Sequence, residues 1–248
     1  MFLDKMMKIK EELMLTEKRQ KHDVYGKFSK KKFNIISEIK KASPSKGDIN
    51  LNADICEIAG EYLKNGASML SVLTESEYFK GSVEDFKQIR SEFPNAILLR
   101  KDFIMEDFQV YESKIIGADI ILIILAFTGI EKSKELIELA HSLGLEILLE
   151  VHNEDEMKAA LTLNTKFVGV NNRNLKTLQV SLDVARNLSK YITKDKIFVC
   201  ESGLNSSEEI SEMIKLGYNS FLIGSHFMKS ENQGEALKEI ISGIKTND

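Results

Sequence analysis

The stretch from Leu143 to Leu163, LGLEILLEVHNEDEMKAALTL, contains one complete copy of the unit from which most of the chain is built. Gly144 follows a helical pattern and is typical of the left-handed residue that ends a helix. The apolar run Glu146–Val151 predicts a buried strand, and the segment near 154–163 has the spacing of an amphipathic helix. The stretch therefore predicts a helix end, a strand, a short polar loop and a second helix.

The same unit recurs along the chain from Phe33 onward. Eight apolar runs predict strands at 33–39, 69–73, 97–99, 120–125, 146–151, 167–170, 197–200 and 220–223. Helical patterns follow these runs near 53–64, 83–93, 107–116, 131–143, 154–163, 182–191, 206–216 and 235–244. Gly66, Gly117 and Gly217 stand in three other units where Gly144 stands in the first. Strands that alternate with helices pair in parallel through right-handed crossovers.

Eight such units in about 215 residues predict an α/β fold, the closed (β/α)8 or TIM barrel. An open Rossmann sheet is the alternative, and the lack of a Gly-x-Gly-x-x-Gly sequence after the first strand disfavours it. The polar stretch 22–32 has no period and predicts a linker. We expect one domain over 1–248, with the barrel in 33–248 and an extra N-terminal helix and linker in 1–32. The helix is predicted by an apolar stripe at Phe2, Met6, Ile9 and Leu13.

Composition narrows the possible partners. With 43% hydrophobic and 29% charged residues, the chain has the composition of a soluble globular protein. Its net charge of -4 gives no basic footprint, so we expect no nucleic-acid partner. The longest apolar run, 120–130, is shorter than the roughly 20 residues that span a bilayer, so we expect no membrane partner. Charged residues interrupt the N-terminal apolar residues, which excludes a secretory signal and predicts a cytoplasmic protein.

The cysteines and histidines predict no metal site. Cys56 and Cys200 have neither the number nor the spacing of a disulfide framework or a zinc site, and both lie in apolar segments. We therefore expect two buried free thiols. The histidines are scattered along the chain, at positions 22, 141, 152 and 226.

Charged and polar residues break the apolar pattern at the ends of five predicted strands. Each of them alone is typical of a solvated rim residue or a turn former. A barrel, however, brings all its strand ends to one mouth, where desolvation and mutual charge shift proton affinities. The sequence therefore predicts an acid–base active site at this mouth. Its members are Glu38, Lys40, Lys101, Glu150, Asn171, Arg173, Glu201 and Ser202.

Two glycine turns predict a phosphate site beside this cluster. Ser202 and Gly203 follow the seventh strand and precede the polar start of a helix at 205–207, and Gly224 and Ser225 follow the eighth strand. Loops after these two strands are the usual phosphate site of a barrel, because free N–H groups and a helix N-terminus face the anion. Ordinary turns are the alternative.

Two aromatic residues lie in loops over the predicted cleft. Phe79 and Phe103 follow the second and third strands. They predict a wall on which a planar substrate stacks, and core packing is the alternative for each.

Seven segments of the sequence, in order between about 33 and 230, resemble the signature of the indole-3-glycerol phosphate synthase family. They are ISEIKKASPSKG at 36–47, SVLTE through YFKGS at 71–82, RKDFI at 100–104, EVHNE at 150–154, VGVNNRNL at 168–175, ESGL at 201–204 and FLIGS at 221–225. The resemblance implies ring closure of 1-(2-carboxyphenylamino)-1-deoxyribulose 5-phosphate to indole-3-glycerol phosphate, with loss of carbon dioxide and water, in tryptophan biosynthesis. It implies a decarboxylating lyase that needs no metal or redox cofactor.

The resemblance also implies a role for each candidate residue. Lys101 matches the general acid at the ketone oxygen, and Lys40 the lysine that holds the substrate carboxylate and shares in proton transfer. Glu150 matches an acid–base residue for the dehydration, and Glu38 a charge stabiliser or second proton carrier. Four residues match the family's phosphate cradle: Ser43, Gly203, Gly224 and Ser225. Two match the apolar wall around the aromatic ring: Phe79 and Phe103. Four match the residues that surround the substrate's polar groups: Asn171, Arg173, Glu201 and Ser202.

The chain departs from the family pattern at Asn174, where aspartate is common. The segment before Glu38 is shorter than in many members. No second catalytic domain follows the eighth strand, so we expect a monofunctional enzyme. We also expect a monomer whose partner is a small phosphorylated molecule. Two other functions stay open. One is a phosphosugar isomerase or Schiff-base aldolase with Lys101 or Lys40 as nucleophile. The other is a noncatalytic phosphate-binding relative.

Overall fold

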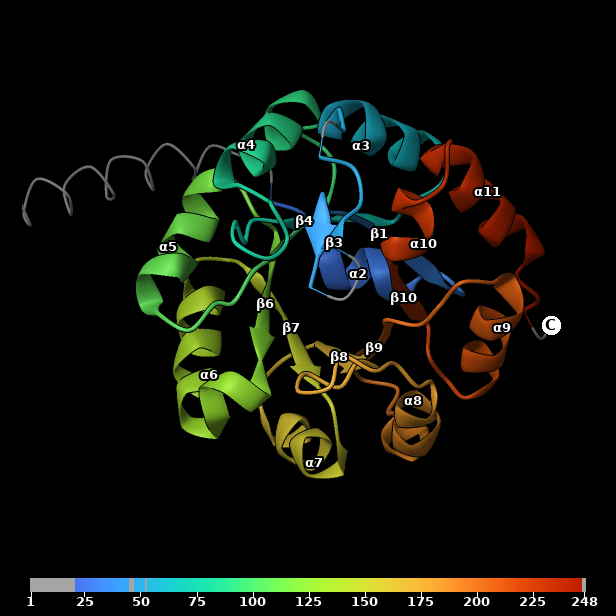
Figure 1. The fold of residues 1–248 in the computed structure, drawn as a ribbon. Coiled ribbons are helices and arrows are strands. Elements are labelled where there is room, and N and C mark those ends of the chain that lie inside the picture. The colour runs from blue at the N-terminus through green and yellow to red at the C-terminus, as the bar shows by residue number, and fades with distance from the viewer. Residues whose placement is uncertain (1–20, 45–46, 52, 247–248) are drawn as a thin grey trace, which may run out of the picture.

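The computed structural model describes residues 21–44, 47–51 and 53–246. Its centre is a closed barrel of eight parallel strands, in which the first strand pairs with both the second and the last (Figure 1). The TIM barrel predicted from the sequence is confirmed, and the open-sheet alternative is wrong. The strands are β1 (Asn34–Ile39), β4 (Met69–Leu73), β5 (Leu98–Lys101), β6 (Ile120–Ile124), β7 (Glu146–Val151), β8 (Phe167–Asn171), β9 (Ile197–Glu201) and β10 (Ser220–Ile223).

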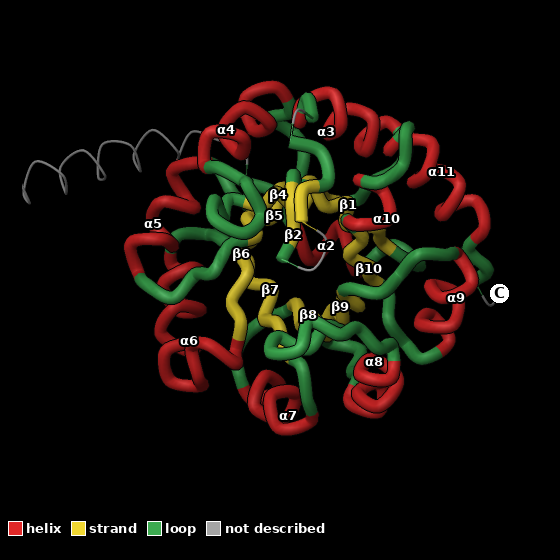
Figure 2. Tube along the Cα trace, viewed as in Figure 1, coloured by secondary structure: helices red, strands yellow, loops and turns green. Residues whose placement is uncertain are grey.

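Helices form a ring around the strands, and loops cross over the centre of the ring (Figure 2). One helix follows each strand, apart from short additional turns. They are α3 (Ile55–Lys64), α4 (Val83–Glu92), α5 (Asp107–Ile116), α6 (Leu125–Ser142), α7 (Glu154–Thr162), α8 (Asp183–Leu188) with the 3-10 turn η1 (Ser189–Tyr191), α9 (Ser207–Lys215), α10 (Ser225–Met228) and α11 (Gln233–Gly243). A two-stranded hairpin of β2 (Ala42–Ser43) and β3 (Gly47–Asp48) lies in the loop after β1.

The predicted glycine helix ends are confirmed. Gly66, Gly117, Gly144 and Gly217 all have positive φ, at 104°, 94°, 71° and 101°. A side chain at such a position meets steric strain, so glycine is the residue that ends these helices most easily.

Helix α6 starts six residues earlier than the predicted start near 131. The chain turns directly from β6 into a helical turn at Leu125, and Gly129, with φ 68° and ψ 177°, separates this turn from the rest of the helix. The apolar run from Ile120 onward hides this boundary, because a buried strand and the buried side of a first helical turn both require apolar residues.

The predicted linker contains a helix, so that prediction is wrong. Helix α2 (Val24–Ser29) begins with Asp23 accepting a hydrogen bond from the Gly26 N–H. Val24 and Phe28 are buried in the barrel interior, and the Phe28 ring packs edge-on against Phe167 with centroids 5.6 Å apart. Helix α2 therefore closes the amino end of the barrel. The helix predicted from the stripe at Phe2–Leu13 lies outside the described residues.

Apolar side chains pack on both faces of the barrel strands. One layer fills the barrel interior and the other lies between the strands and the surrounding helices. Cys200 is buried as predicted, whereas Cys56 is half-buried, and both thiols are free. Within the described part of the chain, no helix is long and apolar enough to cross a bilayer.

Candidate active site

A cavity of about 630 Å³ opens at the carboxyl ends of the strands. Strand ends and loops that are distant in sequence meet there, as the sequence predicted. Of the fourteen predicted site residues, thirteen line the cavity: Glu38, Lys40, Phe79, Lys101, Phe103, Glu150, Asn171, Arg173, Glu201, Ser202, Gly203, Gly224 and Ser225.

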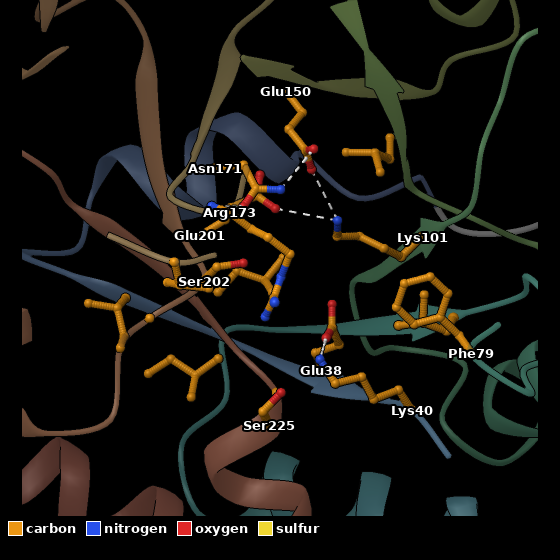
Figure 3. Close-up of a pocket in the computed structure, with 18 of the residues that line it drawn as sticks. Glu38, Lys40, Phe79, Lys101, Glu150, Asn171, Arg173, Glu201, Ser202 and Ser225 are labelled. Atoms are coloured by element: carbon orange, nitrogen blue, oxygen red, sulfur yellow. Dashed lines mark hydrogen bonds and ion pairs between the residues drawn. The ribbon is translucent and has the colours of Figure 1, made fainter. Parts of the chain in front are cut away.

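Lys101, at the end of β5, is the central cation of this cavity. Its Nζ lies 3.2 Å from Glu150 Oε2 and 3.4 Å from Glu201 Oε2 (Figure 3). Burial disfavours the charged amine, but the surrounding carboxyl groups, chiefly the Glu150 carboxylate, outweigh burial and raise the pKa of Lys101. Lys101 is therefore an ammonium ion at neutral pH.

Glu150, at the end of β7, is an ionised carboxylate. Its side chain is only 1% exposed, and burial alone would raise its pKa. The charge of Lys101, the contact with His152 and a hydrogen bond from Asn171 Nδ2 (2.9 Å, to Oε1) outweigh burial and lower the pKa. Asn171 in turn accepts a hydrogen bond from the Arg173 N–H through its Oδ1, which fixes the orientation of the amide.

Glu201, at the end of β9, is protonated at neutral pH, unlike Glu150. Burial raises its pKa, the charges of Glu150 and Glu38 raise it further, and Lys101 compensates only in part. The Oε1 atom is buried and has no hydrogen-bond partner among the described residues. It fits against β8 because residue 169 is glycine: a Cβ there would lie 2.0 Å from this oxygen. Two carboxyl groups beside one ammonium thus differ in protonation, as acid–base catalysis requires.

Lys40 and Glu38 form a second ion pair, with Nζ 2.6 Å from Oε1. Glu38 is buried at the end of β1 and packs against Gly224, where a Cβ would lie 2.5 Å from Glu38 Oε1. Figure 3 shows Lys40 and Glu38 on the side of the cavity opposite Glu150. The cavity therefore offers two separate lysines, one on each side.

The predicted phosphate site is only partly as expected. Ser202 and Gly203 have φ of 64° and 85°, so a tight left-handed turn follows β9. The helix start behind this turn is partly occupied, because the N–H groups of Asn205 and Ser206 donate to Glu209 Oε2 (2.6 and 3.2 Å). Two of the amides expected to face an anion therefore have a partner within the protein, and a phosphate site at this helix start stays a prediction. Gly203, Gly224 and Ser225 line the cavity without that helix start.

Ser43 is the predicted residue that the structure does not bring to the cavity. It is buried in β2, and it is not among the described residues that line the cavity. Its hydroxyl has no hydrogen-bond partner among the described residues. The neighbouring positions 45 and 46 lie outside the description.

Two aromatic rings, those of Phe79 and Phe103, line one side of the cavity, and Phe127 packs beside Phe103. The ring centroids of Phe79 and Phe103 are 6.5 Å apart, and those of Phe103 and Phe127 are 5.6 Å apart. The Glu75 carboxylate holds the loop that carries Phe79 by accepting hydrogen bonds from three of its backbone N–H groups.

Several apolar residues in or beside the cavity, and the histidine behind Glu150, were not predicted from the sequence. Phe127 was hidden in the apolar run that begins at β6. The loop after β8 contributes aliphatic side chains at every second or third position, a pattern visible in the sequence but not interpreted: Leu175, Leu178, Val180 and Leu182. His152 contacts Glu150, but a lone histidine in a loop carries no signal of its own.

A closed (β/α)8 barrel with a buried lysine between two carboxyl groups at its mouth defines a barrel enzyme of the acid–base class. The family model for indole-3-glycerol phosphate synthase matches residues 4–240 of this sequence. The chain belongs to the indole-3-glycerol phosphate synthase family.

Curated relatives that bear this name are similar over most of the chain. The protein from Lachnospira eligens is 41% identical over 232 residues, covering 92% of this chain and 86% of that protein. The protein from Endomicrobium trichonymphae is 42% identical, covering 93% and 89%. The protein from Chromobacterium violaceum is 45% identical, covering 83% and 77%.

Solved structures with low sequence identity share the fold. KGPDC from Streptococcus mutans has a TM-score of 0.69 at 14% identity and covers 86% of this chain and 97% of that chain. The 3-hexulose-6-phosphate synthase from Salmonella typhimurium has a TM-score of 0.69 at 12% identity, covering 86% and 98%. These likenesses concern the barrel alone.

Proposed function

We propose that Lys101, Lys40, Glu150 and Glu201 carry out the decarboxylating ring closure of 1-(2-carboxyphenylamino)-1-deoxyribulose 5-phosphate, the reaction of the family to which the chain belongs. The product is indole-3-glycerol phosphate, an intermediate of tryptophan biosynthesis. One observation carries this assignment of roles: a buried ammonium, Lys101 Nζ, lies between an ionised and a neutral carboxyl group at the barrel mouth.

Lys101 is the acid of the first step. The ring carbon that bears the carboxylate forms a bond to the ketone carbon, while the ketone oxygen takes a proton from Lys101 and becomes a hydroxyl. Positive charge then rests on the aniline nitrogen. The bond to the carboxylate breaks, carbon dioxide leaves, and the electron pair of that bond restores the aromatic ring.

Lys40 holds the substrate carboxylate until that bond breaks. Its Nζ lies 2.6 Å from the Glu38 carboxylate. The substrate carboxylate binds to the same ammonium group, beside Glu38. Because Glu38 stays beside it, Lys40 remains neutralised in part, and the carboxylate is not bound too tightly to leave.

The last step removes the new hydroxyl as water. Glu201 lies beside Lys101 and carries a proton at neutral pH, so it is placed to protonate the oxygen that Lys101 has already protonated once. Glu150 is ionised and removes a proton from the carbon next to the nitrogen, which forms the double bond of the indole. Over the reaction the substrate takes one proton from Lys101 and one from Glu201 and gives one to Glu150. The net uptake of one proton, which solvent restores, matches the carboxylate that leaves as neutral carbon dioxide, and no step is an oxidation or a reduction.

The remaining site residues hold the ends of the substrate. Phe79 and Phe103 form an apolar wall that suits the aromatic ring. Gly203, Gly224 and Ser225, on the other side of the cavity, are proposed to hold the phosphate through backbone N–H groups. Asn171, Arg173 and Ser202 surround the hydroxyl groups between them. We also keep the predictions of a monomer and of a cytoplasmic enzyme.

The charge state of Lys101 argues against a Schiff-base aldolase. An imine forms only from a neutral amine, and aldolases lower the pKa of their lysine to obtain one. Here the neighbouring carboxylates raise the pKa of Lys101. An acid is therefore supported and a nucleophile is not.

The test is the product. Purified chain incubated with the substrate is expected to form indole-3-glycerol phosphate, followed by its fluorescence, with one carbon dioxide released per turnover. Borohydride added during turnover is expected to leave the mass of the protein unchanged. A borohydride-trapped adduct on Lys101 together with cleavage of a ketose phosphate would overturn the proposal.

A further inference from the structure

His152 lies directly behind Glu150 and is not among the described residues that line the cavity. Its Nε2 lies 3.1 Å from Glu150 Oε1, and its Nδ1 lies 3.1 Å from Glu156 Oε2. The ring is thus held between two carboxylates, one on β7 and one in the first turn of α7. Its side chain is 12% exposed, so solvent screens these contacts little.

Glu156 is itself fixed in place. Its Oε2 accepts a hydrogen bond from the backbone N–H of His152 (2.8 Å), and its Oε1 accepts one from Asn153 Nδ2 (2.6 Å). Asn153 caps α7 by accepting from the Glu156 N–H (2.9 Å). The imidazole therefore has a rigid anionic partner on the side away from the active site, and its orientation is set by the start of the helix.

Each ring nitrogen lies 3.1 Å from a carboxylate oxygen, although Nε2 is not aligned for a hydrogen bond with Glu150. The two neighbouring carboxylates favour the doubly protonated, cationic ring. Burial lowers the pKa of His152, but Glu150 and Glu156 outweigh burial and raise it to about 9. The groups that face Glu150 in turn are Lys101 on β5, Asn171 on β8 and this histidine. Glu201 on β9 shares Lys101 with Glu150, and the Glu150 charge helps to raise the pKa of Glu201. Glu150 therefore has two cationic neighbours.

The two cations differ in what happens to them during the reaction. Under the proposed function, Lys101 gives its proton to the substrate in the first step and becomes a neutral amine. Glu150 would then lose the charge that keeps it ionised, just before the step in which it acts as a base. The His152 charge does not take part in that transfer and is still present.

We propose that His152 is a positioning residue of the active site: clamped by Glu156, it supplies the permanent cation that keeps the Glu150 carboxylate ionised and oriented while Lys101 changes its charge. This inference rests on the proposed function. It assigns a role to Glu156 as well, which acts on Glu150 only through His152.

The test compares two charge-removing variants with a matched control. His152→Gln is expected to lower kcat about tenfold to a hundredfold with KM within about threefold, because substrate contacts are unchanged. Loss of the cation raises the pKa of Glu150, so the acid limb of the kcat profile is expected to move to higher pH by about one unit.

Glu156→Gln is expected to lower kcat mainly at alkaline pH, because His152 then loses its proton more easily. Asp155→Asn removes the same charge from the same helical turn and is expected to leave the profile unchanged.

The outcomes separate the two proposals. A wild-type chain that forms no indole-3-glycerol phosphate would overturn the proposed function. An active wild type whose His152→Gln variant keeps both its rate and its pH profile would overturn the inference alone. An unshifted profile together with a lower thermal midpoint would also overturn it, since that result marks a purely structural contact.

Discussion

The two ends of the barrel bury the same kinds of charged groups in opposite ways. At the amino end, Arg90 Nη2 lies 2.6 Å from Asp119 Oδ2, and Asp119 also accepts hydrogen bonds from the Leu98 N–H (2.9 Å) and faces His22 Nδ1 at 3.1 Å. Arg90 donates further bonds to four backbone carbonyls. Arg90 and Asp119 therefore form a fully paired buried cluster.

At the carboxyl end the charges are not matched in this way. Lys101 is shared by two carboxyl groups, one of which stays protonated, and a buried oxygen of Glu201 has no hydrogen-bond partner among the described residues. Ser202 adds a left-handed backbone conformation that is unusual outside glycine. The paired charges of Arg90 and Asp119 therefore serve stability, whereas Lys101 and the unpartnered oxygen of Glu201 are available to a substrate.

The largest effect is expected from Lys101→Met. It removes the shared ammonium without adding bulk, and loss of a positioned acid costs about a hundredfold to ten-thousandfold in kcat. Stability is expected to change little, within about 4 °C in the thermal midpoint, because Glu201 is already protonated and the His152 cation still faces Glu150. A variant within threefold of the wild-type rate would remove Lys101 from the mechanism.

Arg90→Met makes the reciprocal change at the amino end. Breaking a buried pair leaves Asp119 without its main partner, so the free energy of unfolding is expected to fall by about 3–5 kcal/mol, measured by urea denaturation. Turnover per folded molecule is expected to stay the same. Lys87→Met on the same helix breaks an exposed pair with Glu84 and is the control, expected to cost less than about 1 kcal/mol. A drop in kcat with unchanged stability would erase the contrast between the two ends.

Glu150→Gln separates binding from chemistry at the carboxyl end. Glutamine keeps the shape and accepts from Asn171 but exchanges no proton, so the single-turnover rate is expected to fall about a hundredfold or more while substrate affinity stays within about tenfold. Affinity is measured by quenching of substrate fluorescence. Glu154→Gln, on the exposed face of α7, is the control. Equal losses of affinity and rate would make Glu150 a binding residue and pass its role to Glu38.

The mouth was easier to predict than the amino end, and the reason is physical. A charge at the end of an apolar run stands out in the sequence, so Glu38, Lys101, Glu150 and Glu201 could be named in advance. Closure of the barrel follows from eight repeats. Helix α2 was missed because only Val24 and Phe28 are buried among many polar neighbours.

Pairings between elements could not be predicted from local pattern. The N–H groups of Asn205 and Ser206 could donate either to an anion outside the protein or to a carboxylate in the helix. In the structure they donate to Glu209. The contact between His152 and Glu150 depends on how the chain turns into α7 after the strand. Both are decided by three-dimensional geometry.

The smallest expected effect concerns an anion at the mouth. Inorganic phosphate at ten times its dissociation constant is expected to stabilise the fold by about 1.4 kcal/mol, a rise of about 3–5 °C in the thermal midpoint, and to inhibit competitively with substrate. The unmatched charges of the mouth predict this response, and the paired charges of Arg90 and Asp119 predict none at their own position.

Gly224→Asp tells which end binds the anion. A Cβ at this position would lie 2.5 Å from Glu38 Oε1, so the new side chain displaces that carboxylate and adds a negative charge where phosphate is proposed to sit. Both the stabilisation and the inhibition are expected to disappear. Asn232→Asp adds the same charge at the cap of α11, where aspartate caps as well as asparagine, and is expected to keep both effects. If phosphate still stabilises Gly224→Asp, the anion binds away from the mouth, and the carboxyl end holds no phosphate cradle at Gly224.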